Sequence, residues 1–388
     1  MAYMSPGVYV EDVPSNEKTI EGVGTSIAAF VGVVEDTVTM PKKPGDSGEN
    51  YPLIAVNTPK RITSWESFKS SFGDIQSGNK LLAHSVYGFF NNGGTTCYVV
   101  RSAENTADAY EAALNKLKSI DEIAIVAIPG NTDDAVQDKL LSHCEKMKDR
   151  FAILDGNTAL ASEEFTKANI TTSRYSIDGY AAIYFPWIKV YDPETKGTIV
   201  VPPSGHIAGI YSRSDNDRGV HKAPANEVIR GALGLEYELS KEDQDGLNPE
   251  NINVIRNFSG SMTIWGARTW SDKGLDPEWK YVNVRRLMNF LRESIEESTR
   301  WVVFEPNDNR LWQKIKRNVN AFLTNVYRSG ALFGASAEEA FYVKCDADTN
   351  PVEVRNLGQV VTEIGVALVK PAEFVIFRIS QSEGKSDS

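Results

Sequence analysis

The chain has 388 residues, a length that suits two domains with sizeable hydrophobic cores. Hydrophobic residues make up 41% of the chain and charged residues 24%, the composition of an ordinary globular protein. The formal net charge of −11 argues against nucleic acid as the main partner. No apolar run reaches the roughly 20 residues of a membrane span, so we expect no direct insertion into a membrane.

Residues 1–24 are predicted to form an extended N-terminal arm that joins a later domain. Two prolines exclude a regular helix, and glycines loosen both ends of the segment. Val8 and Val10 share one face of a short strand, with Tyr9 on the other face. The first residues lack the basic and apolar regions of a signal peptide, so we expect synthesis and assembly in the cytoplasm.

Residues 25–257 are predicted to form an α/β domain with a mostly parallel sheet and flanking helices. Strands are expected at 27–34, 97–101, 123–130, 151–156 and 180–186. Helices are expected at 64–73, 80–94, 107–117, 133–147 and 159–168, with a long surface loop at 36–60. Strands that alternate with helices indicate right-handed crossover connections. The alternation is lost between residues 187 and 260, where Pro, Gly, Asp and Asn are frequent, so we place the end of the domain in this zone.

Residues 258–388 are predicted to form an α+β domain together with the N-terminal arm. A strand at 261–269 would enter this domain. The apolar positions of a first helix are Val284, Leu287, Met288, Leu291 and Ile295. A second helix, which Asn309 can cap, has the apolar stripe Leu311, Ile315, Val319, Phe322 and Val326. Strand-like runs follow at 341–345 and at 374–379.

The two terminal strand-like segments have no evident partner within the chain. A strand needs one, because its backbone N–H and C=O groups must form hydrogen bonds. We therefore predict that both segments add to sheets of neighbouring molecules. The residues predicted to take part in this exchange are Val8, Tyr9, Val10, Phe374, Val375, Ile376, Phe377 and Ile379.

Basic side chains follow one stripe of the second C-terminal helix. At about 100° per residue, Arg310, Lys314, Arg317 and Arg328 fall beside its apolar face, whereas Lys316 lies on the other flank. Residues 281–330 hold nine basic and five acidic residues, a net charge of +4, so the rest of the chain carries −15. Such a stripe is either a solvated helix face or a contact surface for an acidic partner.

No residue pattern indicates a catalytic, metal or cofactor site. The segment 24–28 resembles the serine motif of subtilisin-like proteases, but no histidine precedes Ser26, so a glycine hinge is favoured. Ser204 and His206 follow two prolines, and a rigid loop is expected there. Asp155 ends a predicted strand, where a capping or turn role is commoner than ligand binding.

The remaining polar candidates have ordinary structural explanations. Asp215 and Asp217 lack the ligand spacing of a calcium loop, and a solvated turn is expected. Three cysteines with no CxxC pair, Cys97, Cys144 and Cys345, are interpreted as buried or tolerated thiols. We therefore predict no enzymatic activity and no cofactor.

Several long motifs carry a family resemblance. They are SPGVYVEDVPS (5–15), YFPWIKV (184–190), VPPSGHIAGIYSRSDNDRGVHKAPAN (201–226), LNP (247–249), WGART (265–269), WVVFEPNDNRLW (301–312), GALFG (330–334), AFYVKCD (340–346) and PAEFVIFRI (371–379). Together they resemble contractile tail sheath proteins, a family that includes phage tail sheaths and the sheaths of phage-like extracellular injection particles. The resemblance spans nearly the whole chain.

The resemblance implies a structural role in a large polymer. Subunits of such sheaths form stacked hexameric rings around an inner tube protein, between a baseplate and terminal cap proteins, and contract to drive the tube through a target envelope. It also implies that terminal strands complete the inner domains of neighbouring subunits and that the C-terminal domain faces the tube, where the basic stripe would make contact. The final location would be a phage tail or an extracellular or cytoplasmic contractile injection particle.

Two alternatives come from other functional classes. One is a subtilisin-like hydrolase on the α/β domain, which the missing histidine disfavours. The other is a soluble monomeric binding module, which the unpaired terminal strands disfavour. Within the sheath family, the motifs do not separate a phage tail from an injection particle, although the chain resembles type VI secretion sheaths less, because those are divided between two chains.

Overall fold

The computed structural model describes residues 19–45, 48–158, 160, 164–272, 274 and 277–376. The chain divides into two compact units. Unit 1 comprises Met1–Val23 and Leu291–Ala367, and unit 2 comprises Gly24–Phe290 and Leu368–Ser388. The backbone therefore passes between the units three times, after Val23, after Phe290 and after Ala367.

Unit 2 is built on a sheet of nine strands, most of them parallel. Their order is β2 (Lys60–Ile62), β3 (Cys97–Ser102), β1 (Ala28–Val33), β4 (Ile125–Ala127), β5 (Phe151–Asp155), β6 (Ala181–Phe185), β11 (Ile252–Phe258), β12 (Ser261–Ile264) and β9 (Glu227–Val228). The six strands from β3 to β11 run parallel, whereas β2, β12 and β9 pair antiparallel at the edges. The predicted mixed α/β fold with a largely parallel sheet is thus present.

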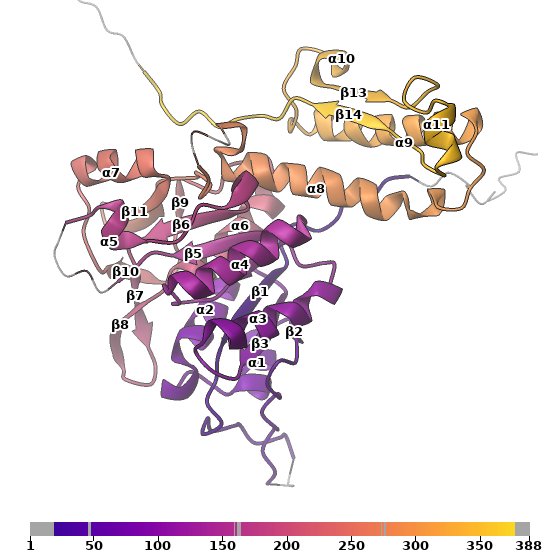
Figure 1. Cartoon of the computed structure of the whole chain (residues 1–388). Helices are drawn as coiled ribbons and strands as arrows, with labels where there is room; N and C mark the ends of the chain where they lie inside the picture. The colour runs from indigo at the N-terminus through magenta and orange to yellow at the C-terminus, as the bar shows by residue number, and fades with distance from the viewer. Residues whose placement is uncertain are drawn as a thin grey trace, which may run out of the picture. The chain divides into compact units, whose positions relative to one another are not determined.

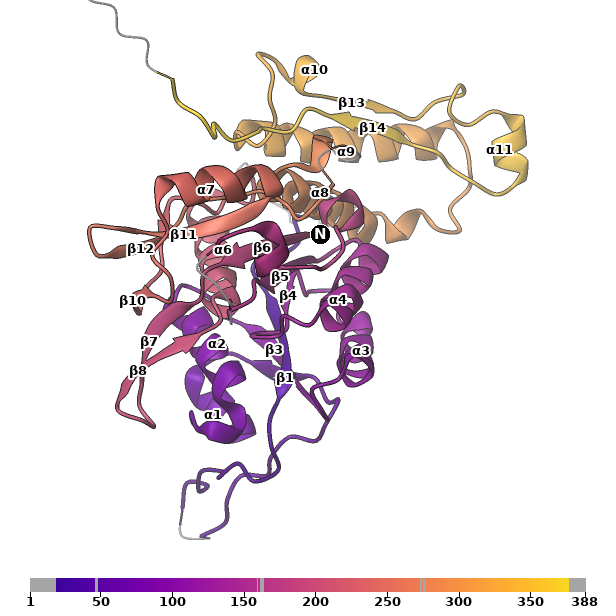
Figure 2. The same ribbon diagram turned by 60° about the vertical axis from the view of Figure 1, so that its left-hand side comes forward.

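Helices cover both faces of this sheet (Figures 1 and 2). One face carries α1 (Trp65–Phe72), α2 (Lys80–Asn91) and α6 (Ser204–Arg218), and the other carries α3 (Ala107–Lys116) and α4 (Asp134–Met147). The central strand β1 alternates between the two cores, since Phe30 packs in the first and Val31 in the second. Burial on both sides explains why this strand is apolar throughout.

The helix starts in unit 2 follow from capping side chains. Ser64 accepts a hydrogen bond from the backbone of α1, Thr106 from that of α3, and Asp133 from that of α4. Each cap satisfies an N–H group that the first helical turn leaves without a partner. The predicted helix at 159–168 is wrong in its described part, where only the short α5 (Lys167–Ile170) forms.

The segment 187–260 is regular, contrary to the prediction. It forms β7 (Ile188–Asp192), β8 (Gly197–Val201), α6, β9, β10 (Ala232–Leu235), α7 (Lys241–Leu247) and β11, and β10, β7 and β8 make a separate three-stranded sheet. The rigid loop expected around Ser204 is the first turn of α6 instead. Helix α6 is buried against α2 because small residues let the backbones approach, and a Cβ on Gly205 would lie 2.4 Å from Ser85 Cα.

The predicted boundary between residues 257 and 258 falls inside unit 2. Strand β12 pairs with β11 in a hairpin, for example Ile255 with Ile264, so the segment 261–269 extends the large sheet and does not enter a C-terminal domain. The last residues, from Leu368, also belong to unit 2. The predicted boundary is wrong because β11 and β12 are joined by backbone hydrogen bonds, and a change in composition does not reveal this pairing.

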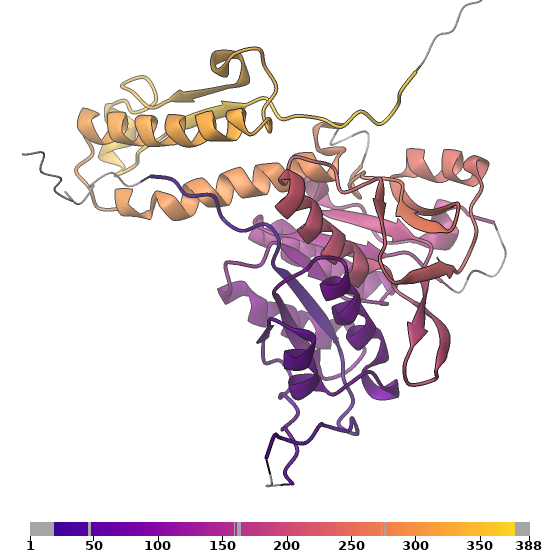
Figure 3. The same cartoon turned by 180° about the vertical axis from the view of Figure 1, so that it is seen from behind.

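Unit 1 is a small α+β unit whose described part is seen from behind in Figure 3. The long α8 (Val282–Ser298) begins in unit 2 and ends in unit 1, followed by α9 (Asn309–Arg328), α10 (Ala337–Ala340), β13 (Phe341–Lys344), α11 (Val352–Asn356) and β14 (Glu363–Val366). Strands β13 and β14 pair antiparallel, and Phe341 and Val343 are buried. The N-cap of α9 is Asp308, not Asn309, since its carboxylate accepts from Leu311 N at 2.9 Å.

Candidate functional site

The basic stripe of α9 is a solvent-facing surface of unit 1. Arg310, Arg317 and Arg328 are exposed, and among the described residues no carboxylate lies within 4.0 Å of any of the three guanidinium groups. Lys314 differs, because its Nζ lies 4.1 Å from the centre of the Trp301 ring and its side chain is half-buried. The opposite face of α9 is buried, as its apolar pattern predicts.

The positive charge is local to this helix. Helix α9 contains five basic residues and no acidic one, whereas residues 291–367 together carry nine basic and eleven acidic residues, a net charge of −2. Two of the nine basic residues counted between 281 and 330, Arg285 and Arg286, are buried in unit 2. The stripe is therefore a basic strip on a mildly acidic unit and not part of a broadly positive domain.

The sheet of unit 1 consists of two strands, β13 and β14, in the part of the chain that the structure describes. In the part of the chain that the structure describes, neither β13 nor β14 pairs with a third strand. An isolated two-stranded hairpin is marginally stable in water, and a third strand or a covering helix is needed. Helix α9 covers one face, while Tyr342 on the other face is exposed. The free edges of this sheet can accept additional strands.

The C-terminal segment ends in exposed apolar side chains. Phe374, Val375 and Ile376 are 69%, 70% and 78% exposed, and residues 371–376 form no strand with the described part of the chain. The other residues predicted to take part in strand exchange lie outside the described residues: Val8, Tyr9, Val10, Phe377 and Ile379. Three adjacent exposed apolar side chains are a typical mark of an interaction segment.

Glu373, directly before these residues, is held by four polar side chains of unit 2. Its carboxylate accepts from Arg268 Nε at 2.7 Å, Tyr281 OH at 2.9 Å and Asn248 Nδ2 at 3.1 Å, and Lys280 Nζ lies at 3.1 Å. Burial alone would raise the pKa of Glu373, but these four partners outweigh it and lower the pKa to about 2. The carboxylate is thus ionised at any ordinary pH. The sequence offered no signal for this contact, since Glu373 lies 105 residues from Arg268.

A buried ion pair of unit 2 lies next to Thr25, near the start of this unit. Arg286 donates to both carboxylate oxygens of Asp215, at 2.9 and 2.6 Å, and to the carbonyl oxygen of Thr25 at 2.9 Å. The Thr25 hydroxyl also donates to Asp215, at 2.6 Å. Both charged side chains are 3% exposed. The solvated turn predicted around Asp215 is wrong, because this residue lies in the last turns of α6. Of the two aspartates, only Asp217 is exposed.

In unit 1, the described end of the arm lies along α8. The backbone N–H of Glu21 donates to Ser298 Oγ at 3.2 Å, and that of Val23 donates to Ser294 Oγ at 3.1 Å. Two serines one helical turn apart thus serve as hydrogen-bond acceptors for alternate residues of an extended chain.

The serine and histidine candidates are structural. Ser204 Oγ donates to Asp155 at 2.7 Å and not to a histidine, and Ser204 N and Gly130 N donate to the same carboxylate, each at 2.9 Å. Asp155 therefore caps the start of α6, in line with the capping role expected from sequence. Its complete burial raises its pKa to about 6. Burial lowers the pKa of His206 to about 3.

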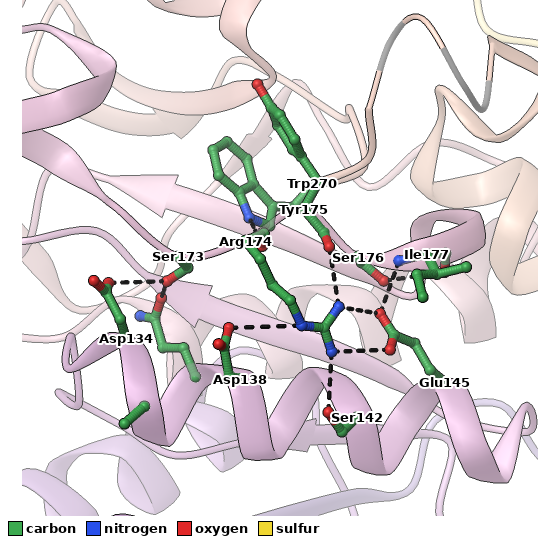
Figure 4. Close-up of polar contacts among 12 residues, drawn as sticks. Asp134, Asp138, Ser142, Glu145, Ser173, Arg174, Tyr175, Ser176, Ile177 and Trp270 are labelled. Carbon is green, nitrogen blue, oxygen red and sulfur yellow. Dashed lines mark hydrogen bonds and ion pairs between the residues drawn. The ribbon is translucent and has the colours of Figure 1, made fainter.

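One network in unit 2 was missed by the sequence reasoning (Figure 4). Arg174 makes a bidentate contact with Glu145 of α4, both distances 2.9 Å, and also donates to Ser142 Oγ at 3.0 Å. Glu145 in turn accepts from Ile177 N at 2.8 Å, and the Arg174 carbonyl accepts from Trp270 Nε1 at 2.8 Å. The network attaches the segment that precedes β6 to helix α4. Its role is structural.

Neither a metal-ligand cluster nor a membrane-spanning helix is present among the described residues. No three His, Cys, Asp or Glu side chains among them are grouped as metal ligands. No helix in the described ranges has the length and apolar character to cross a bilayer. The three cysteines are free and buried, as predicted.

Comparison with known proteins identifies the family. A family model described as the phage tail sheath protein central domain matches residues 103–270, and one described as the phage tail sheath C-terminal domain matches residues 275–382. A putative prophage major tail sheath protein of Pseudomonas aeruginosa (strain UCBPP-PA14) is 26% identical, covering 97% of this chain and 96% of that protein. The tail sheath protein of Vibrio phage KVP40 is 28% identical over 54% of this chain, which spans only 29% of the phage protein.

Solved structures agree over almost the whole chain. The sheath complex of PVC, an extracellular contractile injection system, in its contracted state has a TM-score of 0.79 and 29% identity, covering 98% of this chain and 99% of that one. The helical sheath of the anti-feeding prophage, also contracted, has a TM-score of 0.76 and 28% identity, covering 98% and 100%. The family models match the central and C-terminal parts of the chain, and the sheath structures match nearly all of it. The chain therefore belongs to the family of contractile tail sheath proteins, which are structural proteins and not enzymes.

Proposed function

We propose that this chain is the subunit of a contractile sheath that polymerises as stacked hexameric rings around an inner tube and contracts to drive the tube through a target envelope. The observation that carries the proposal is the likeness to the sheath of an extracellular contractile injection system over 98% of the chain, with a TM-score of 0.79. Unit 1 would be the inner domain, next to the tube, and unit 2 the outer domain. Baseplate and terminal cap proteins would bind the two ends of the polymer.

Strand exchange is the proposed link between subunits. The segments around Val8 to Val10 and Phe374 to Ile379 would add to the two-stranded sheets of neighbouring subunits. Five or six backbone hydrogen bonds contribute about 1 kcal/mol each, whereas ordering the same residues costs about 1–2 kcal/mol apiece. Burial of side chains such as Phe374 and Ile376 adds about 1.5–3 kcal/mol each, which tips the balance toward exchange.

The basic stripe of α9 is the proposed tube contact. Arg310, Lys314, Arg317 and Arg328 would face acidic residues on the outer wall of the tube. Exposed ion pairs contribute about 0–1 kcal/mol each and are screened by salt, so the contact is weak per subunit. A weak contact suits a sheath that releases its tube on contraction, while many subunits acting together still bind the tube.

Deletion of the terminal segments tests the proposed assembly. Removal of residues 1–14 or of residues 374–388 is expected to leave a folded subunit that no longer forms tubular polymers. Negative-stain electron microscopy measures the polymers, and thermal unfolding of the soluble subunit serves as the control for folding. Polymers of normal length from both deletion variants would contradict strand exchange.

A further inference from the structure

The C-terminal segment leaves unit 2 from a fixed point. Glu373 is only 19% exposed and has contacts from Arg268, Tyr281, Asn248 and Lys280, all of unit 2. The next three residues, by contrast, are at least 69% exposed and form no strand with the described chain. The change from a largely buried side chain to largely exposed ones therefore occurs between two adjacent residues.

The partners of Glu373 are themselves held in place. Arg268 Nη1 donates to the Asn248 carbonyl oxygen at 2.6 Å, and Arg268 N donates to Asn253 Oδ1 at 2.7 Å. Asn253 belongs to β11 of the large sheet and is fully buried. An arginine fixed at its backbone and at its guanidinium group presents a rigid fork to a carboxylate. The position of Glu373 is therefore fixed, through Arg268 and Asn253, relative to the large sheet of unit 2.

A second contact holds the chain just upstream. Asn283 Nδ2 donates to the Val369 carbonyl oxygen at 3.1 Å and to the His221 carbonyl oxygen at 2.8 Å. The segment is thus held at Val369 and again at Glu373, and both its position and its direction are set before the exposed residues begin.

The other terminus is held in an equivalent way. The backbone of Thr25, two residues after the chain enters unit 2, accepts from Arg286, which is paired with Asp215. Within unit 2, a pair of one carboxylate and one guanidinium group thus lies at Thr25 and at Glu373, fully buried in the first case and partly buried in the second. Such pairs are costly to bury and add little to stability over an apolar contact, so a role in specificity accounts for them better.

We propose that Glu373 is a positioning residue for strand exchange, which fixes the exit of the C-terminal segment so that Phe374 to Ile376 are presented to the unit 1 sheet of a second copy of this chain. This inference rests on the proposed strand exchange. A segment released from Glu373 would sample more conformations before pairing, because each freed residue adds conformational entropy that pairing must remove. Its effective concentration at the acceptor sheet of the neighbouring subunit falls accordingly.

The test compares polymerisation of three full-length variants and one shortened variant with that of the wild type. Glu373→Gln removes the charge but keeps the size of the side chain, and is expected to raise the lowest subunit concentration that gives sedimentable polymer about tenfold. Lys280→Met removes one of the four partners and is expected to raise it about threefold. Glu122→Gln is the matched control, since Glu122, in the turn before β4, also has an arginine and a tyrosine neighbour, Arg61 of β2 and Tyr98 of β3, and neither neighbour belongs to a terminal segment.

The fourth variant, which ends at Glu373, separates this inference from the proposed function. If it fails to polymerise while Glu373→Gln polymerises at the wild-type concentration, strand exchange stands and the positioning role is refuted. If the shortened variant polymerises normally, exchange of the C-terminal segment and the positioning role of Glu373 are both refuted. Thermal unfolding checks that each variant is folded. Should Glu373→Gln not fold, Lys280→Met decides, and an unchanged polymerisation threshold for it would overturn the inference.

Discussion

Reversal of one charge on α9 tests whether the basic stripe contacts the tube. Arg317→Glu changes an exposed residue that has no ion pair among the described residues, so the fold itself should be unaffected. Lys316→Glu is the matched control, because it makes the same charge change at the adjacent position, on the other flank of the same helix. Lys314 is less suitable, since its reversal would also remove the contact with Trp301.

The size of the effect follows from the exposure of the residue. An exposed ion pair contributes about 0–1 kcal/mol, and reversal replaces attraction with a repulsion of similar size. The expected change is therefore up to about 2 kcal/mol per subunit at low salt, which corresponds to binding of one subunit to the tube that is weaker by up to roughly 30-fold. In the proposed hexameric ring, six subunits acting together would multiply this loss.

The assay uses co-expression of each variant with the tube protein. With Arg317→Glu, electron microscopy is expected to show sheath polymer without tubes inside, whereas Lys316→Glu should give filled sheaths like the wild type. Binding of wild-type subunits to purified tubes should also weaken as salt rises from low to physiological ionic strength. Equal numbers of filled sheaths from the two variants would show that the stripe is only a solvated face.

Three further predictions concern unit 2. Asp215→Asn leaves the buried Arg286 unpaired and should lower the free energy of unfolding by about 3–5 kcal/mol in urea titrations of a non-polymerising variant, and a loss below 1 kcal/mol would contradict the assigned contact. Gly205→Ala should destabilise unit 2, because its Cβ would lie 2.4 Å from Ser85 Cα. Gly246→Ala in α7, whose Cβ would have no atom within 4 Å, should be neutral or stabilising by about 0.5–1 kcal/mol. Equal thermal unfolding of the two variants would refute the α2–α6 packing. The pKa of Asp155 is raised from 3.8 to about 6, so the folded state holds this proton more tightly than the unfolded one, and the wild type should lose about 3 kcal/mol of stability relative to Asp155→Asn as pH rises from about 4 to about 6; parallel pH profiles of the two proteins would refute the raised pKa.

Local patterns in the sequence determined the elements that bury one face or are apolar throughout. Helix α9 is amphipathic, and it spans the whole of the predicted apolar stripe from Leu311 to Val326. The central strands β1, β3, β5 and β6 are apolar runs between turn residues, and their positions were predicted for the same reason. The caps Ser64 and Asp133 are likewise local, because a cap contacts backbone atoms only two or three residues away.

Tertiary structure alone decided the remaining elements. Helix α6 is buried on most sides and rich in small and polar residues, so it has no periodic apolar face, and its packing depends on the close approach of Gly205 and Gly209 to α2. The membership of β12 in the large sheet depends on pairing with β11 and β9, which composition does not encode.

Some features of the candidate site could be predicted from the sequence, and others depend on the tertiary structure. The basic stripe and the exposed Phe374 to Ile376 follow from helical spacing and from the chain's own apolar pattern, and the sequence contained both. Glu373 and its partner Arg268 are separated by 105 positions, as Thr25 and Arg286 are by 261, and only the folded backbone brings each pair together. A periodic pattern of apolar residues predicts local structure, because it involves residues close together in the sequence. These contacts join residues far apart in the sequence, and they form only because the fold of unit 2 brings those segments together.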